Sequence, residues 1–251
     1  MLLLRALFLH LMLVLGSAPA RAAEPLLVLV DAGNPPFMYN AGGVDTAAGV
    51  YPAMLYAAFA RAGVPVVVKA APWKRAMLEL EHGAAGLGGI YKNDERAAKF
   101  DYSDPIFVER IAVFYNTQNP IDFHTIRDLF GKRVGVIRGW SYGDDMDLAR
   151  KNDHVAVEEV NGDQQNFKKL ASGRLDAVLA IVESGERMLE EGAGELGYIK
   201  MSNTLLASNP AYLAFAKKAN QSDGLKLFNK AMAAMKKDGS LDKLFQQELA
   251  R

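Results

Sequence analysis

Two successive runs of strands alternating with helices constrain the fold of this chain more than any other feature of its sequence. In the first run, apolar stretches that predict strands at 26–30, 64–70 and 87–91 alternate with segments of helical periodicity at 51–62 and 73–81. The first helix is expected to stop at Gly63 and the second at His82-Gly83. Strands and helices in this order predict a parallel sheet flanked by helices.

A second unit of the same kind follows along the chain. Its expected strands are 133–137, 155–160 and 175–181, and its expected helices are 126–130, 144–151, 164–172 and 184–191. Extended apolar stretches lie between the units, at 110–115, and after the second unit, at 212–216, and a helical tail broken at Asp238-Gly239 covers 225–249. Two α/β units joined by two extended crossovers predict a two-lobed protein whose first lobe is discontinuous in sequence. Such a hinge supports closure around a ligand.

The N-terminus has the pattern of a secretory signal peptide. Residues 1–15 are almost all apolar, apart from Arg5 and His10, and the small-x-small sequence Ala20-Arg21-Ala22 follows. The apolar run is short for a membrane span, which needs about 20 residues. We therefore expect cleavage of residues 1–22, with an uncleaved N-terminal anchor as the alternative. A lipoprotein anchor is excluded because the chain has no cysteine.

Composition and charge exclude several classes of function. The chain has 29 basic and 29 acidic residues, so it lacks the basic excess expected of a nucleic-acid-binding protein. The absence of cysteine excludes disulfides and thiolate metal sites. The 4 histidines are scattered, with no pair at ligand spacing, so we expect neither a metal nor another cofactor.

A loop at 139–143 has the Gly-x-Ser-x-Gly sequence of a hydrolase nucleophile elbow, between a predicted strand and a predicted helix. A hydrolase triad would place an acid and then a histidine after Ser141. The only later histidine is His154, which leaves no room for the intervening acid. We therefore interpret this segment as a ligand-binding loop. The glycine-dense segment 83–89 lacks a following Lys-Ser/Thr and leads into a strand, so it is not interpreted as a phosphate loop.

Short motifs along the mature chain match a known family in number, order and spacing. They are Asn34-Pro35-Pro36-Phe37, Asp94-Glu95-Arg96, Tyr102-Ser103-Asp104-Pro105, the segment 128–136, Gly139-Trp140-Ser141, Gly173-Arg174-Leu175-Asp176-Ala177-Val178 and Lys237-Asp238-Gly239-Ser240-Leu241. With these motifs the chain resembles the bacterial extracellular solute-binding proteins of family 3, which serve ABC importers for amino acids and related solutes. The resemblance implies an α/β, type II periplasmic-binding-protein fold with two lobes joined by two hinge strands. Lobe 1 would comprise 23–111 and 211–251, lobe 2 would comprise 119–208, and the crossovers would be 112–118 and 209–210.

The resemblance also implies a ligand site between the lobes. Arg96 matches the arginine that binds the ligand carboxylate, a contact that favours a bidentate guanidinium; a surface salt bridge with Asp94 or Glu95 is the alternative. The other expected contacts are the lobe 1 aromatic residues and the lobe 2 loop, namely Phe37, Tyr39, Trp73, Tyr91, Gly139, Trp140 and Ser141. Each aromatic residue could equally belong to the core.

The sequence departs from the amino-acid-binding pattern in three places. Amino-acid binders carry an Asp soon after the strand at 175–181, where it accepts the ligand's α-ammonium, and this chain has aliphatic residues there. Glu183 is the nearest replacement, although it also reads as an acid at a helix start. The sequence Pro72-Trp73-Lys74-Arg75 is similar to a less characterised Trp-x-Arg branch, and Tyr91 stands where many members have a small hydroxyl residue. The identity of the ligand therefore stays open.

The resemblance implies a monomeric, non-enzymatic periplasmic protein that binds a small polar, carboxylate-bearing ligand and delivers it to the membrane permease of an ABC importer. Two alternatives remain. Cyclohexadienyl or arogenate dehydratases share the fold, and Glu183 would then be the general acid. A ligand-sensing partner of a membrane receptor would use the same closure.

Overall fold

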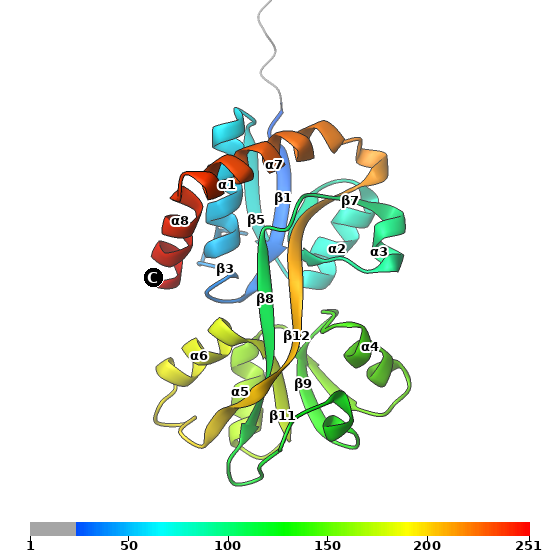
Figure 1. Cartoon of the computed structure of the whole chain (residues 1–251), viewed down its shortest axis with the longest axis vertical. Helices are drawn as coiled ribbons and strands as arrows, with labels where there is room; N and C mark the ends of the chain where they lie inside the picture. The colour runs from blue at the N-terminus through cyan, green and yellow to red at the C-terminus, as the bar shows by residue number, and fades with distance from the viewer. Residues whose placement is uncertain (1–23) are drawn as a thin grey trace, which may run out of the picture.

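The computed structural model describes residues 24–251, so the predicted signal peptide lies outside the described residues. Figure 1 shows two lobes stacked along the long axis of the molecule and connected by two long strands, β8 (Phe107–Asn116) and β12 (Ile199–Ala216). Within 24–251, no helix is long and apolar enough to cross a membrane.

Lobe 1, the upper lobe in Figure 1, combines the first α/β unit with the C-terminal helices. Its strands are β1 (Leu26–Asp31), β2 (Gly33–Asn34), β3 (Met38–Asn40), β4 (Ala47–Ala48), β5 (Val66–Ala71), β6 (Gly86–Tyr91) and β7 (Phe100–Tyr102). Its helices are α1 (Val50–Ala62), α2 (Trp73–His82), α3 (Asp94–Lys99), α7 (Ser222–Lys237) and α8 (Ser240–Leu249), with the short turn η2 (Lys217–Ala219) before α7. Lobe 1 thus combines elements from both ends of the described chain.

Lobe 2, the lower lobe, is the second α/β unit. Its strands are β9 (Arg133–Ile137), β10 (Ala156–Val160) and β11 (Ala177–Ile181), and its helices are α4 (Asp144–Lys151), α5 (Asp163–Ala171) and α6 (Val182–Glu191), with the 3-10 turn η1 (Ile126–Leu129) ahead of β9. The predicted helix 126–130 is therefore only this short turn.

One sheet continues through both lobes. Its strand order is β10-β9-β11-β8-β12-β6-β1-β5, with β7 paired to β12 off this path. In this sheet, β1, β5 and β6 of lobe 1 and β9, β10 and β11 of lobe 2 pair in parallel, whereas β8 and β12 pair antiparallel to each other and to their neighbours. The short strands β2, β3 and β4 form a separate antiparallel sheet. The two crossover strands are therefore central strands of the sheet as well as connections between lobes.

The position of the first crossover differs from the expected 112–118. Residues Ile111 to Tyr115 of β8 pair with Ala177 to Ile181 of β11, which places them inside the sheet of lobe 2. The strand passes between the lobes earlier, where Glu109 faces Asn209 and Val108 faces Pro210 of β12. The expected second crossover at 209–210 thus lies opposite the passage of β8. A single strand serves both lobes, so the apolar pattern that predicts it does not mark where one lobe ends.

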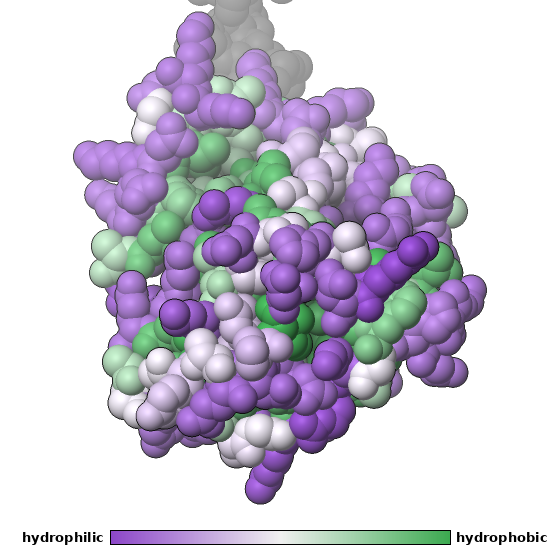
Figure 2. All heavy atoms as spheres, turned by 60° about the horizontal axis from the view of Figure 1, so that its bottom comes forward, coloured by the Kyte–Doolittle hydropathy of each residue, from purple (hydrophilic) through white to green (hydrophobic). Residues whose placement is uncertain are grey.

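Two clusters of buried hydrophobic residues hold the lobes together internally. The larger cluster fills lobe 1 and extends into lobe 2 through residues such as Val134, Val136 and Trp140. The smaller one lies in lobe 2, where Phe114 and Phe167 pack edge to face with ring centroids 5.1 Å apart. Figure 2 brings the lower end of the molecule forward and shows hydrophilic residues over most of that face, with hydrophobic residues in smaller patches.

Candidate ligand-binding site

Two tryptophans meet where the lobes face each other. Trp73 begins α2 in lobe 1, and Trp140 lies in the loop after β9 in lobe 2. Their ring centroids are 5.9 Å apart at 63°. Trp73 Nε1 donates to the carbonyl of Gly139 at 3.1 Å, and Trp140 Nε1 donates to Asp31 Oδ2 at 2.8 Å. Each lobe therefore supplies one indole donor and one acceptor to the contact, which we call the seam.

Backbone packing at Gly33 makes the seam tight. Gly33 belongs to lobe 1, and a Cβ atom added to it would lie 2.1 Å from the carbonyl oxygen of Asn161 and 3.3 Å from the Cα of Gly162, both in lobe 2. A side chain at this position would collide with lobe 2 backbone. The seam thus closes to a distance that only glycine permits.

A polar pair extends the seam beyond the glycines. Asn34 and Ser184 are both buried, and Ser184 Oγ donates to Asn34 Oδ1 at 2.7 Å. The Asn34 Nδ2 group makes no hydrogen bond within the described chain. A buried donor without a partner is uncommon in native proteins, so this amide has capacity for a ligand or a water molecule.

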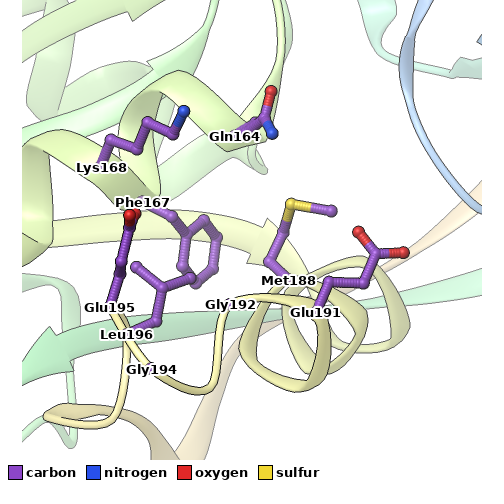
Figure 3. A pocket seen from close by; sticks show the side chains of 9 residues that line it. All are labelled: Gln164, Phe167, Lys168, Met188, Glu191, Gly192, Gly194, Glu195 and Leu196. Carbon is purple, nitrogen blue, oxygen red and sulfur yellow. The ribbon is translucent and has the colours of Figure 1, made fainter.

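A cavity of about 340 Å³ opens beside the tryptophans and is lined from both lobes, by Asp31, Pro72, Trp73, Lys74, Arg75, Leu78, Ile137, Arg138 and Asn161. A second hollow of about 350 Å³, drawn in Figure 3, lies in lobe 2 between Phe167 of α5 and Met188 of α6. Its lining comes from lobe 2 alone, so lobe closure would not enclose a ligand there.

Arg96 lies in α3, which begins at the N-cap Asn93, whose side chain accepts a hydrogen bond from the Arg96 amide at 2.9 Å. The guanidinium is partly buried and donates to the Tyr91 carbonyl at 3.0 Å. Burial lowers its pKa, an effect opposed by the charges of Tyr102 and of Asp147 in lobe 2. Arg96 forms no ion pair with a residue of the described chain, and its expected partners Asp94 and Glu95 do not bind it. Its contact with a ligand carboxylate stays a prediction.

The lobe 2 loop at 139–141 faces lobe 1, but the hydroxyl of Ser141 in this loop already binds a lobe 2 residue. Ser141 Oγ donates to Asp147 Oδ2 at 2.5 Å, within α4. Gly139 has φ +76, in the left-handed region that favours glycine, and this turns its carbonyl toward Trp73. The loop therefore contacts lobe 1 through Gly139 and Trp140, while Ser141 closes the first turn of α4.

The four predicted aromatic contacts have different surroundings. Phe37 has no exposed surface and packs against Tyr51 and Phe107, with ring centroids 5.9 and 5.6 Å away, so its surroundings are those of a core residue. Tyr39, on β3, is half-buried. Trp73 is in the seam, and Tyr91 points to the crossover strands. Their roles as ligand contacts stay predictions.

Glu109 connects lobe 1 to the crossover strand β8. It is 1% exposed, and its two carboxylate oxygens accept hydrogen bonds from the hydroxyls of Tyr51 and Tyr91. Burial raises the pKa of Glu109 to about 7, and the two tyrosine hydrogen bonds oppose this effect. The carboxyl therefore changes its charge near neutral pH in a place that the sequence-based prediction did not single out.

Glu183, the predicted replacement for the missing Asp, is the second residue of α6 and contacts the crossover strand β8. Arg110 Nη2 binds its Oε1 at 3.0 Å, and its Oε2 is buried with no hydrogen-bond partner in the described chain. The structure thus places Glu183 beside β8, while Arg96 lies with α3 and Trp73 and Trp140 lie in the seam. Among the predicted residues, Arg96 contacts Tyr91 and Trp73 contacts Gly139.

Two further buried acids lie at the seam, one from each lobe. Burial raises the pKa of Asp31 to about 6 despite its hydrogen bond from Trp140. Burial also raises the pKa of Asp163, the first residue of α5, to about 7, with a further contribution from the charge of Asp31. Within residues 24–251, no group of three or more metal-binding side chains is assembled.

The sequence-based prediction missed Asp31, Glu109 and Asp163 for identifiable reasons. Asp31 ends an apolar strand, which is a weak signal for a buried acid, and Glu109 occupies one position in an apolar stretch. Asp163 follows Gly162 at a helix start, where an acid is ordinarily explained by the helix dipole. Its neighbour Gly162 packs on Gly33 of lobe 1, a contact that the local sequence does not encode.

Comparisons with known proteins agree with this architecture. The sequence profile of bacterial extracellular solute-binding proteins, family 3, matches residues 26–250. The L-cystine-binding protein TcyJ of Escherichia coli (strain K12) is 28% identical over 193 residues, which cover 74% of this chain and 68% of that protein.

Among solved structures, an ancestral arginine-binding protein bound to arginine superposes with a TM-score of 0.76 at 27% identity, covering 89% of this chain and 97% of that one. A histidine kinase sensor domain with similarity to periplasmic binding proteins shares the fold, with a TM-score of 0.79 at 20% identity, covering 91% and 97% of the two chains. These matches confirm the predicted two-lobed periplasmic-binding-protein fold. The chain belongs to the bacterial extracellular solute-binding proteins, family 3.

Proposed function

We propose that this protein captures a small amino-acid-like ligand in the periplasm by closing its two lobes and delivers it to the permease of an ABC importer. The observation that carries the proposal is the seam, where contacts such as Trp140 to Asp31 and Trp73 to Gly139 join opposite lobes. These contacts form only when the lobes are closed. A ligand that binds between the lobes contacts both of them only in the closed form. It would therefore bind that form more tightly and shift the equilibrium toward closure.

Arg96 is the proposed carboxylate-binding residue of the ligand site. Its guanidinium is partly buried, has no carboxylate partner in the described chain, and feels the charge of Asp147 across the interlobe space. A partly desolvated guanidinium favours a planar, bidentate carboxylate ligand. The cystine- and arginine-binding relatives support an amino acid as the ligand class.

The experiment that tests the proposal is a thermal-shift screen of the mature protein against amino acids, polyamines, small carboxylates and prephenate. A ligand present at 100 times its dissociation constant stabilises the fold by about 2.7 kcal/mol, which is an easily measured shift. Stabilisation by an amino acid without chemical change supports the binding function. Conversion of prephenate or arogenate to product would instead assign the dehydratase activity.

An importer role and a sensor role differ in the membrane protein that the ligand-loaded form binds. If the protein serves an importer, adding the ligand-loaded protein to its permease in proteoliposomes stimulates ATP hydrolysis and ligand uptake. If it serves a membrane sensor, the same loaded form binds that receptor without supporting uptake. The fold is compatible with both partners, since it is shared with a histidine kinase sensor domain.

A further inference from the structure

Asp163 is a buried acid with an unused hydrogen-bonding atom. The residue is 3% exposed, and its Oδ1 has no hydrogen-bond partner in the described chain. Buried carboxylates in native proteins are usually paired or hydrogen-bonded, because an isolated buried charge is costly. The fold therefore keeps an acceptor at this place without supplying a donor for it.

The location of Asp163 puts this acceptor at the interlobe space. Its neighbour Gly162 packs on Gly33 of lobe 1, with Gly162 Cα 3.3 Å from the position of an added Gly33 Cβ. The charge of Asp163 also reaches two lobe 1 residues, because it contributes to raising the pKa of Tyr91 and is itself affected by Asp31. Asp163 thus lies next to a backbone contact between the lobes and is electrostatically coupled to lobe 1.

The neighbouring acid Asp31 is already occupied. Its Oδ1 accepts from the amide of Ala32 at 2.6 Å, and its Oδ2 accepts from Trp140 Nε1 at 2.8 Å. Asp163 is therefore the open acceptor of the two acids, and Asp31 adds a second negative charge nearby. The other titratable group coupled to Asp163 is Tyr142, whose hydroxyl accepts from the Ile137 amide at 2.8 Å.

Asp31 and Asp163 are buried acids on opposite lobes, and the charge of one affects the pKa of the other, so a positive charge near both would be favourable. A neutral donor would satisfy the hydrogen bond of Asp163 but leave the repulsion between Asp31 and Asp163 in place, whereas a cation satisfies both. In the described chain, no cation offsets the burial of Asp163. A ligand with a positively charged group would supply this cation.

We propose that Asp163 accepts a hydrogen bond from an ammonium or guanidinium group of the ligand, with Asp31 supplying a second negative charge from the opposite lobe. This inference rests on the proposed function and names the residue that receives the ligand's cationic end. It also explains how the chain functions without an Asp after β11, because the acid comes instead from the start of α5.

Asp144 provides a matched control for Asp163. Both acids are the first residue of a helix in lobe 2 and both follow a glycine, Gly143 or Gly162. Asp144 is exposed, whereas Asp163 is buried at the seam. The variants Asp163→Asn and Asp144→Asn therefore remove the same charge from the same helical position, and only one of them affects the proposed site.

The test is calorimetric titration of wild-type protein and both variants with an amino acid that binds in the thermal-shift screen, and with the same compound lacking its amino group. We expect Asp163→Asn to weaken binding of the amino compound at least tenfold and to leave the deaminated compound unchanged within twofold. Asp144→Asn should leave both affinities unchanged within twofold. The Tm of ligand-free Asp163→Asn at pH 8 should equal or exceed that of the wild type, which separates lost binding from lost folding.

Proton release gives an independent readout. A cation that binds Asp163 stabilises its charged form, so binding at pH 7 should release protons, and the apparent binding enthalpy should then differ between phosphate and Tris buffers. In Asp163→Asn this difference should become smaller. Unchanged affinity in Asp163→Asn, or equal losses for the amino and deaminated compounds, would overturn the inference and leave the proposed function standing. If wild-type protein binds no amino acid or amine, both are overturned.

Discussion

The lobes of this protein are connected at the crossover strands and at the seam, and these two regions differ in chemistry. At the crossover, β8 and β12 pair in an antiparallel ladder, and the buried Glu109 accepts hydrogen bonds from the hydroxyls of Tyr51 and Tyr91. At the seam, two indole hydrogen bonds and a glycine contact join surfaces that have no covalent link.

Because of this difference, we expect the two lobes to separate at the seam without unfolding. A typical hydrogen bond contributes about 0.5–1.5 kcal/mol net, so the few contacts of the seam can be exchanged for water at modest cost. The crossover strands are flanked on both sides by other strands of the sheet, so we expect them to stay paired when the lobes open. Substitutions in the seam should therefore change ligand affinity, whereas substitutions at the crossover should change stability.

The largest effect is expected from Arg96→Ala, which removes the proposed partner of the ligand carboxylate. Loss of one partner of a buried charged pair costs about 2–5 kcal/mol of binding free energy. Lys99→Ala is the control, because Lys99 lies on the same helix and binds only Glu95 on the surface. Calorimetry with the identified ligand measures both, and a loss of only a few tenths of a kcal/mol for Arg96→Ala would remove Arg96 from the site.

Gly33→Ala should come next, because its Cβ would meet the Asn161 carbonyl only when the lobes are closed. Overpacking costs about 1–3 kcal/mol, which corresponds to binding weaker by about 5- to 150-fold. The Tm without ligand should not change, since the collision is with the opposite lobe. Gly194→Ala, at a position with no atom within 4 Å of the added Cβ, should leave affinity unchanged. Wild-type affinity in Gly33→Ala would show that binding does not require the seam to close.

Substitution of the two seam tryptophans should weaken ligand binding to different extents. Trp140→Phe leaves the buried Asp31 without its indole donor, and an unsatisfied buried group costs about 1–3 kcal/mol. Trp73→Phe removes a donor to the carbonyl of the exposed Gly139, so its cost should be smaller. Ligand titrations measure the loss of affinity in each variant. A larger loss in Trp73→Phe than in Trp140→Phe would mean that the hydrogen bond from Trp140 to Asp31 is not needed for closure.

Stability should fall as pH rises from about 5 to 8. The folded pKa values of Asp31, Glu109 and Asp163, about 6, 7 and 7, exceed their ordinary values near 4. Between these values the folded chain binds more protons than the unfolded chain, so its free energy of unfolding decreases with increasing pH. Each kcal/mol lowers the Tm of a domain of this size by about 2–4 °C. A Tm that rises over this range would contradict the assignment of these three acids as buried.

The smallest change in affinity is expected from Glu109→Gln at the crossover. This substitution keeps a side chain of similar shape and removes the charge, so the Tm should depend less on pH than in the wild type. Ligand affinity should stay within about twofold, because both carboxylate oxygens of Glu109 are already used by the hydroxyls of Tyr51 and Tyr91. A large loss of affinity in Glu109→Gln would show that the crossover, like the seam, takes part in ligand binding.

Much of the fold was predictable because local patterns encode it. The apolar runs at 26–30 and 133–137 became β1 and β9, and the helices at 51–62 and 73–81 ended at Gly63 and Gly83, with φ of 68° and 75°. The periodicity of strands and helices, and the ability of glycine to adopt positive φ, depend on only a few neighbouring residues. These signals can therefore be recognised in the sequence without knowledge of the tertiary structure.

The sequence by itself determined the two α/β units, their order and the extended strands that join them. It did not determine which acids are buried, because burial at the seam depends on the opposite lobe. The sequences Gly143-Asp144 and Gly162-Asp163 begin two helices in the same way, yet Asp144 is exposed and Asp163 lies against lobe 1. Only the tertiary structure distinguishes them, because folding brings Gly33 against Gly162 and brings the charge of Asp31 near Asp163, although these lobe 1 residues lie far away in the chain.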